Sequence, residues 1–126
     1  MVEGRGKTLS EAVANVALGM LNAITPLEGI REKEIYSVEV GGIDLQSLIF
    51  NLLDELLYRN DSEGLTAKRL SVEIDEKSLR ARAEGWGERF SAATHEVGIA
   101  VKAVTYHMMS IENKVGEWVV RVVFDT

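Results

Sequence analysis

The sequence VKAVTYHMMSIE, residues 101–112, and the closing run WVVRVVFDT, residues 118–126, are both long and rich in β-branched and aromatic residues. This composition predicts two strands, and the short polar turn NKVGE between them predicts a hairpin. The pair carries most of the unusual polar side chains: Lys102, Tyr106, His107 and Asp125. We therefore expect a functional site on these two strands.

Two amphipathic helices are predicted upstream of the hairpin. Thr8 opens a capping-box sequence, TLSE, and apolar residues at helical spacing then predict a helix over residues 9–24. Pro26 ends this helix because it has no N–H to donate. Asp44 is a suitable N-cap for a second helix, predicted over residues 45–58, whose leucines form the strongest apolar stripe in the chain.

The remaining segments predict strands and one loop. Residues 2–7 resemble the end of a strand, residues 35–40 alternate as a half-buried strand does, and residues 69–74 and 79–86 predict a second hairpin. Residues 87–99 have weak periodicity, which predicts a loop. This order of elements is typical of an α+β fold, with a mostly antiparallel sheet and two amphipathic helices packed against it.

Composition limits the classes of function. The 126 residues, 46% of them hydrophobic, predict a single domain over residues 1–126. The net charge of −6 argues against direct, tight nucleic-acid binding and suits a basic protein partner or a bound cation. The chain has no cysteine, no signal-peptide pattern at its start and no apolar run long enough to span a membrane. We therefore expect a cytoplasmic protein with no membrane contact.

Asp125 and Thr126 are candidate metal ligands. The Asp125 carboxylate, the Thr126 hydroxyl and the terminal carboxylate are neighbours in the sequence, and hard cations such as Ca²⁺ bind clusters of oxygen ligands. A solvated chain end without metal is the alternative interpretation.

The other polar candidates each have a structural interpretation beside a functional one. His95 and His107 have no neighbour at metal-ligand spacing, so each is either a structural hydrogen-bonding residue or a catalytic one. Lys102 alternates with apolar neighbours, which is typical of a solvated sheet face. Asp54 and Glu55 lie beside the leucine stripe, either as a solvated helix edge or as an acid pair for acid–base chemistry. The sequence contains no phosphate-binding loop and no nucleophile motif.

Four segments resemble the archease family. They are GKTLSEAVANVALGML at the first helix, DLQSLIFNLLDELLY at the second, HEVGIAVKAVTYHMMSIE before the final turn, and VVFDT at the end. The likeness follows the whole chain in order, and VKAVTYH with the terminal aspartate is its most specific part.

The resemblance implies an accessory protein rather than an enzyme. Archease assists the GTP-dependent RNA-splicing ligase that joins tRNA halves, by promoting guanylylation of the ligase and repeated turnover. The resemblance also implies a divalent cation, most often calcium, bound by an N-terminal aspartate and by the C-terminal one, which is Asp125 here with Thr126 adjacent. Lys102 matches a position expected to matter for activation of the partner, and His107 and His95 fall on motif positions with less defined roles.

One family motif is absent from the sequence. The N-terminal aspartate belongs to a His-Thr-Ala-Asp motif, and counting back from Gly6 it would fall about two residues before Met1. We therefore expect Met1 to be an internal methionine of a longer natural protein, which the mass of the native protein would test.

Three functions remain open at this point. The first is activation of an RNA-splicing ligase. The second is a general chaperone or modulator of nucleic-acid-processing proteins, and the third is a small hydrolase that uses His95, His107 and Asp125.

Overall fold

The computed structural model describes residues 1–126, and its elements alternate between strands and helices before a run of strands closes the chain. In order they are β1 Val2–Gly6, α1 Leu9–Ile24, a 3-10 turn Leu27–Gly29, β2 Glu34–Gly41, α2 Leu45–Glu63, β3 Leu65–Asp75, β4 Arg80–Arg89, β5 Ala103–Val104, β6 Ser110–Lys114, β7 Glu117–Val122 and β8 Phe124–Asp125.

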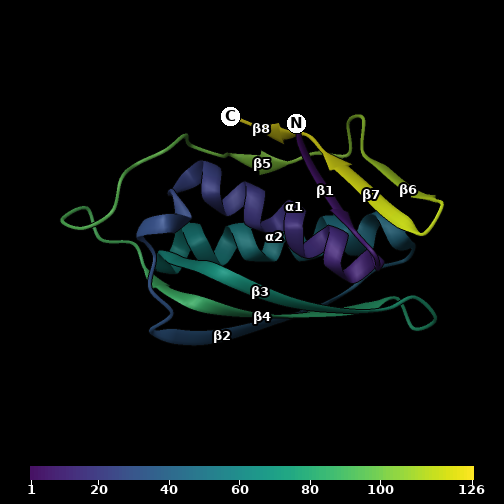
Figure 1. Ribbon diagram of the computed structural model, residues 1–126, viewed down its shortest axis with the longest axis horizontal. Helices are drawn as coiled ribbons and strands as arrows, with labels where there is room; N and C mark the ends of the chain where they lie inside the picture. The colour runs from purple at the N-terminus through teal and green to yellow at the C-terminus, as the bar shows by residue number, and fades with distance from the viewer.

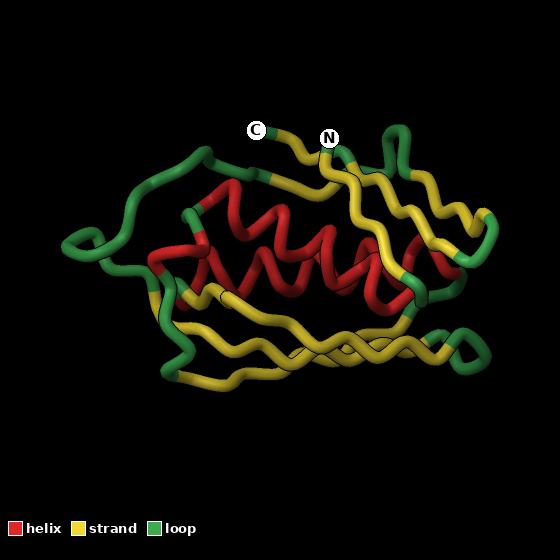
Figure 2. Tube along the Cα trace, in the orientation of Figure 1, coloured by secondary structure: helices red, strands yellow, loops and turns green.

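The two helices form a central layer between strands (Figure 1). One three-stranded sheet has the order β2-β4-β3 and lies on one side of the helices, whereas the sheet β1-β7-β6 and the short pair β5-β8 lie on the other. Figure 2 shows the helices in red between these yellow strands. All the strand pairs are antiparallel, which confirms the predicted α+β class, but the strands form three sheets rather than one.

Both helices begin where the capping residues predict. The Thr8 hydroxyl accepts a hydrogen bond from the Glu11 N–H, and α1 covers the predicted residues 9–24. Asp44 and Ser47 form a reciprocal capping box at the start of α2. The prediction that α2 ends near residue 58 was wrong by about a turn, because the chain continues helically to Glu63 and ends at a left-handed Gly64.

The apolar stripes of the two helices form most of the core. Leu52 and Leu53 of α2 and Val13 and Met20 of α1 are fully buried. Val72 of β3 belongs to the same cluster of 27 buried residues. Burial of this area is the main favourable contribution to folding. Neither helix combines the length and the hydropathy that a membrane-spanning helix requires.

The hairpin predicted at residues 69–74 and 79–86 is present and longer than expected. β3 and β4 pair from Leu65↔Arg89 to Asp75↔Arg80. β3 thus extends beyond the predicted residues 69–74 at both ends, and β4 starts at Arg80 and continues three residues past the predicted end at Trp86. The predicted loop after them therefore begins at Phe90 instead of Gly87.

The closing hairpin differs most from its prediction. Residues 101–112 do not form one strand, because β5 pairs with β8 in one sheet and β6 pairs with β7 in another. Between β5 and β6 the Tyr106 ring stacks on Phe50 of α2 with 4.3 Å between ring centroids. Met108 then has a φ of 56°, in the left-handed region. The stacking contact and this turn draw the chain toward α2 and interrupt the ladder.

Candidate functional site

A shallow depression lies where the outer side of α2 meets the chain just before β5. Its volume is about 390 Å³. It is lined by Asp54, Glu55, Leu57, Tyr58, Asp61 and Lys102. We call these six residues the α2 depression. Lys102, a candidate from the sequence, thus lies in the same depression as Asp54 and Glu55, which the sequence places at the edge of a helix.

The elements around the depression hold it in place. Leu56 and Leu57 are buried, which anchors α2 on the core and leaves Asp54, Tyr58 and Asp61 on its outer side, three and four residues apart. The Lys102 N–H donates to the Asp125 carbonyl oxygen at 2.7 Å, so the β8 segment fixes the backbone from which Lys102 projects.

The charges of the depression are unpaired. No carboxylate of Asp54, Glu55 or Asp61 lies within ion-pair distance of a base, and Lys102 makes no ion pair. Three acids around one lysine leave an excess of negative charge. Such a surface attracts a basic protein surface or a cation and repels phosphate groups.

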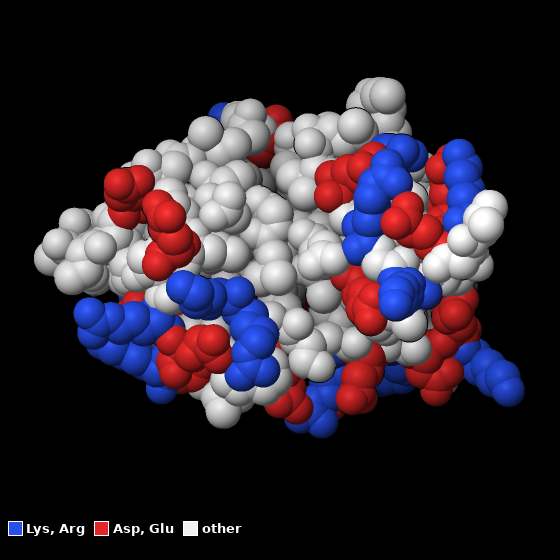
Figure 3. Space-filling view, viewed as in Figure 1, with Lys and Arg blue, Asp and Glu red and all other residues white.

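The charged surface over β1, β7 and β6 contains ion pairs. Figure 3 shows acidic and basic side chains interleaved over β1, β7 and β6, with a broad uncharged band over α1 beside them. In that group Glu3 pairs with both Arg5 and Arg121 at 2.8 Å, and these contacts, with the Arg5 hydrogen bond first, hold the pKa of Glu3 below its usual value. The α2 depression therefore differs from the paired surface over β1, β7 and β6.

Asp125 and Thr126 lie at the exposed end of β8. Asp125 is opposite Ala103 in the β5–β8 ladder. Within residues 1–126, no three histidine or carboxylate side chains are grouped so that they could hold a metal ion. Because tight calcium sites need several oxygen ligands, these two residues alone do not complete such a site, and calcium binding stays a prediction.

His95 has a structural environment. Its side chain is 2% exposed. Its Nδ1 accepts a hydrogen bond from the Ser91 N–H at 2.8 Å, and its Nε2 lies 3.1 Å from a Glu88 carboxylate oxygen. Backbone donation from Arg31, then the contacts to His95, lower the pKa of Glu88. Both ring nitrogens are thus engaged in holding the loop that follows β4.

His107 lies elsewhere, in the exposed loop between β5 and β6. It stands between Tyr106, which is 52% exposed, and Met108, which is 68% exposed. His95 is buried with both ring nitrogens engaged, whereas His107 lies in a separate, exposed loop. The geometry therefore gives no support to the hydrolase interpretation.

Asp61 and Tyr58 are site residues that sequence reasoning missed. The sequence predicted that α2 would end at Tyr58, which placed Asp61 outside the helix. The spacing of Asp54, Tyr58 and Asp61 on the side opposite the leucines was the available signal, since residues three and four apart share a helix face.

Comparison with known proteins identifies the family. The model of the Archease protein family (MTH1598/TM1083) matches residues 1–126. The protein archease of Sulfurisphaera tokodaii is 36% identical over 124 residues, and that of Pyrococcus abyssi is 39% identical over 127. Each of these alignments covers 98% of this chain and 89% of the relative.

Solved structures agree with the fold. The solution structure of protein 1598 from Methanobacterium thermoautotrophicum superposes with a TM-score of 0.84 at 34% identity and covers 98% of this chain and 89% of that one. The Thermotoga maritima protein, described as an archease and possible chaperone, gives a TM-score of 0.63 at 20% identity, with 98% and 87% covered. These likenesses extend over nearly the whole chain, and the resemblance that the sequence motifs predicted is confirmed: the chain belongs to the archease family.

Proposed function

We propose that this protein is an accessory protein that activates a GTP-dependent RNA-splicing ligase by promoting guanylylation of the ligase and repeated turnover. The observation that carries this proposal is the α2 depression, where unpaired Lys102 and unpaired carboxylates face solvent beside the C-terminal strand. Membership of the archease family supports an accessory role rather than an enzymatic one. We place this activity in the cytoplasm, where reduced, disulfide-free proteins are typical.

The charges suggest how each side chain takes part. The carboxylates of Asp54 and Asp61 attract a basic surface of the ligase and orient it. Lys102, the one cation of the depression, then pairs with an acidic side chain of the ligase and so favours the conformation in which the nucleotide is transferred. The protein's net charge of −6 disfavours direct, tight binding to RNA, so we expect the contact to be with the ligase itself.

Replacing Lys102 tests this function. We expect Lys102→Ala to lower multiple-turnover ligation at least about tenfold, because one charge-assisted contact contributes enough to change a rate by this factor. Purified ligase from the same source would receive GTP, divalent metal and excess RNA ends, with and without this protein.

The matched control is Lys77→Ala, since Lys77 is exposed in the turn between β3 and β4 and makes no side-chain ion pair. It should activate as the unaltered protein does. If Lys102→Ala activates equally well, Lys102 has no role in activation, and if the unaltered protein leaves turnover at one ligation per enzyme, the proposed function is wrong.

We also infer that Asp125 and Thr126 take part in binding a divalent cation, most often calcium in this family. The register of β1 and β7 supports this inference. Val2 pairs with Val122 and Gly6 with Trp118. A residue placed two positions before Met1 and continuing this register would lie opposite Asp125. An added aspartate there would supply the second carboxylate that the family motif contains.

A general chaperone is the second candidate function. The Thermotoga maritima protein of the same fold is described as a possible chaperone. In this chain Val97 is 78% exposed and Ile99 is 54% exposed, and a chaperone would bind unfolded clients through exposed apolar side chains such as these. This function predicts suppression of aggregation of unrelated proteins by both the unaltered protein and Lys102→Ala, whereas the activator predicts an effect on the ligase alone.

A further inference from the structure

An apolar groove adjoins the α2 depression and is separate from the residues discussed for activation, apart from Asp61, which lines both. Its volume is about 530 Å³, within the range of pockets that bind ligands. It lies between the C-terminal ends of α1 and α2 and the loop after β4. We call it the helix-end groove, and the lining residues that matter below are Ile24, Asp61, Phe90, Val97, Gly98 and Ile99.

The loop that forms one wall is held firmly against α1. The Gly98 N–H donates to the Ile24 carbonyl oxygen and the Ile99 N–H to that of Ala23, both at 2.8 Å. A Cβ atom on Gly98 would come within 2.0 Å of the Ala23 oxygen, so the backbone approaches this closely only because residue 98 is glycine. The wall is therefore preformed and does not need to order when it binds a partner.

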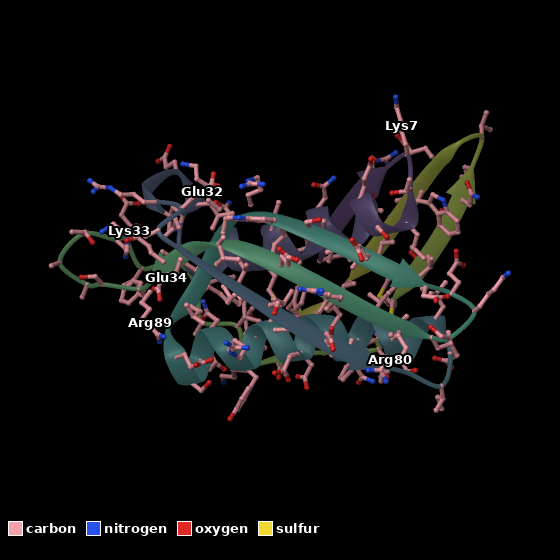
Figure 4. All side chains as sticks on the ribbon, turned by 90° about the horizontal axis from the view of Figure 1, so that it is seen from below. Lys7, Glu32, Lys33, Glu34, Arg80 and Arg89 are labelled. Atoms are coloured by element: carbon pink, nitrogen blue, oxygen red, sulfur yellow. The ribbon has the colours of Figure 1, made fainter.

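The other end of the same loop is also fixed. His95 and Glu88 hold its middle, as described above. Arg89, the last residue of β4, donates to the Glu63 carbonyl oxygen at 2.9 Å and lies 3.8 Å from Glu34. Figure 4 shows Arg89, Glu34 and Lys33 near one another at this end of the sheet. The loop thus leaves the sheet from an anchored position.

Apolar side chains project from this fixed backbone into solvent. Val97 is 78% exposed, Ile99 is 54% exposed and Phe90 is 37% exposed. Exposed apolar residues that cluster beside a groove, with its lining backbone fixed, indicate a surface that binds another apolar group.

The charge at the groove is negative. Asp61 is its only charged lining residue and makes no ion pair. Both helices end here, and neither has a basic residue in its last turn. Helix C-termini carry partial negative charge. Gly98 and Ile99 satisfy two carbonyls of α1 and Arg89 satisfies one of α2, but no base lies within ion-pair distance of Asp61. The groove therefore favours an apolar group next to a cation and disfavours phosphate.

We propose that the helix-end groove is a docking site for a segment of the protein partner in which apolar side chains are followed by lysine or arginine. The apolar side chains would pack against Val97, Ile99 and Phe90, and the cation would pair with Asp61. This inference rests on the proposed function in that the natural partner is the ligase, and it assigns that partner a second contact beside the one at Lys102.

The first test uses a peptide instead of the ligase. The probe is a short synthetic peptide of leucines flanked by lysines, titrated into the ¹⁵N-labelled full chain and followed by NMR. We expect shifts of the amide signals of Gly64, Gly98 and Ile99. The Val97→Ser/Ile99→Ser variant should lower the affinity at least about tenfold, because it removes several methyl groups from the contact. Asp61→Asn should lower it about threefold or more, because one charge pair is lost.

Controls separate the groove from general adhesion. Ile43→Ser removes an apolar side chain that is 89% exposed outside the groove and should change nothing. A peptide with glutamate in place of lysine should bind at least several-fold more weakly. Shifts located away from the groove, or equal binding of both peptides, would overturn the proposal. The NMR spectrum of each variant shows directly whether it is folded.

The second test uses the ligase and keeps the two proposals distinguishable. If the unaltered protein activates the ligase and Val97→Ser/Ile99→Ser raises the concentration needed for half-maximal activation, the groove docks the ligase. If this variant activates at the same concentration, the groove is not the ligase contact, although the proposed function stands. If the unaltered protein does not activate but the peptide binds selectively, the groove holds as a peptide site and the proposed function fails.

Discussion

At the scale of single residues, Tyr36 shows a conflict between packing and hydrogen bonding. Its ring lies over Gly85 of the neighbouring strand, where a Cβ atom would come within 2.8 Å of the ring. The Tyr36 hydroxyl is buried and has no hydrogen-bond partner. Burial raises the pKa of Tyr36 to about 12, although Arg59 nearby acts in the opposite direction. The packed ring therefore stabilises the fold, whereas the buried hydroxyl without a hydrogen-bond partner destabilises it.

Tyr36→Phe should therefore stabilise the protein or leave its stability unchanged. The substitution removes an unsatisfied hydroxyl, whose burial costs about 1–3 kcal/mol, and keeps the packed ring. Urea unfolding at pH 7 measures the change, and Tyr58→Phe, at a residue that is 62% exposed, serves as the control with no expected effect. A loss of more than about 1 kcal/mol in Tyr36→Phe would mean that the hydroxyl has a partner after all.

At the scale of elements, the turn between β6 and β7 has a residue poorly suited to its conformation. Lys114 pairs with Glu117, so Val115 and Gly116 form a two-residue loop. Both have positive φ, 47° and 76°, which is typical of a type I′ turn that favours asparagine followed by glycine. Val115 is fully exposed, so its side chain gains no burial that offsets this backbone conformation.

Val115→Asn should stabilise this hairpin. A β-branched residue in the left-handed region costs about 1–2 kcal/mol, and asparagine tolerates that region. We expect a gain of about 1 kcal/mol in the free energy of unfolding, measured by denaturant titration. Val97→Asn, at another exposed valine without positive φ, is the matched control. If Val115→Asn is less stable than the unaltered protein, side-chain contacts outweigh the backbone effect at this turn.

At the scale of the whole molecule, the two ends of the chain lie close together (Figure 1). β1 begins at Val2, which pairs with Val122, the last residue of β7. β8 follows after a single residue, so Asp125 lies three residues past the last residue that pairs with β1. Any ligand set that combines Asp125 with a residue preceding Met1 is therefore created by pairing of distant segments, not by neighbours in the sequence.

Calcium should distinguish this chain from one extended by His-Thr-Ala-Asp and one further residue, which places the added aspartate two positions before Met1, opposite Asp125 in the register of β1. A ligand that binds only the folded state raises stability by RT ln(1 + [L]/Kd), so a weak site gives little stabilisation. We expect millimolar Ca²⁺ to raise the melting temperature of the extended chain by several degrees and that of the present chain by less than about one degree. The rise should disappear in the extended chain carrying Asp125→Asn. An equal rise in all three proteins would place the cation elsewhere.

The sequence alone determined the existence and the start of both helices, the pairing of β3 with β4 and the α+β class, because these depend on local capping and on the period of apolar residues. The motif VKAVTYH with its terminal aspartate also indicated the family. This motif also identified Lys102 as a candidate site residue, because Lys102 is part of the motif.

Only the tertiary structure decided how residues 101–126 are divided and which side chains meet. Stacking of Tyr106 on Phe50 divides the predicted strand between two sheets, and this contact joins residues 56 positions apart. The same applies to the α2 depression and the helix-end groove, since Asp61 meets Lys102 and Ile99 only when α2 packs beneath the loop and β5. The conformational preference of each residue depends on its neighbours in the sequence and not on contacts between distant segments. The geometry of those contacts is therefore set by packing of the whole core.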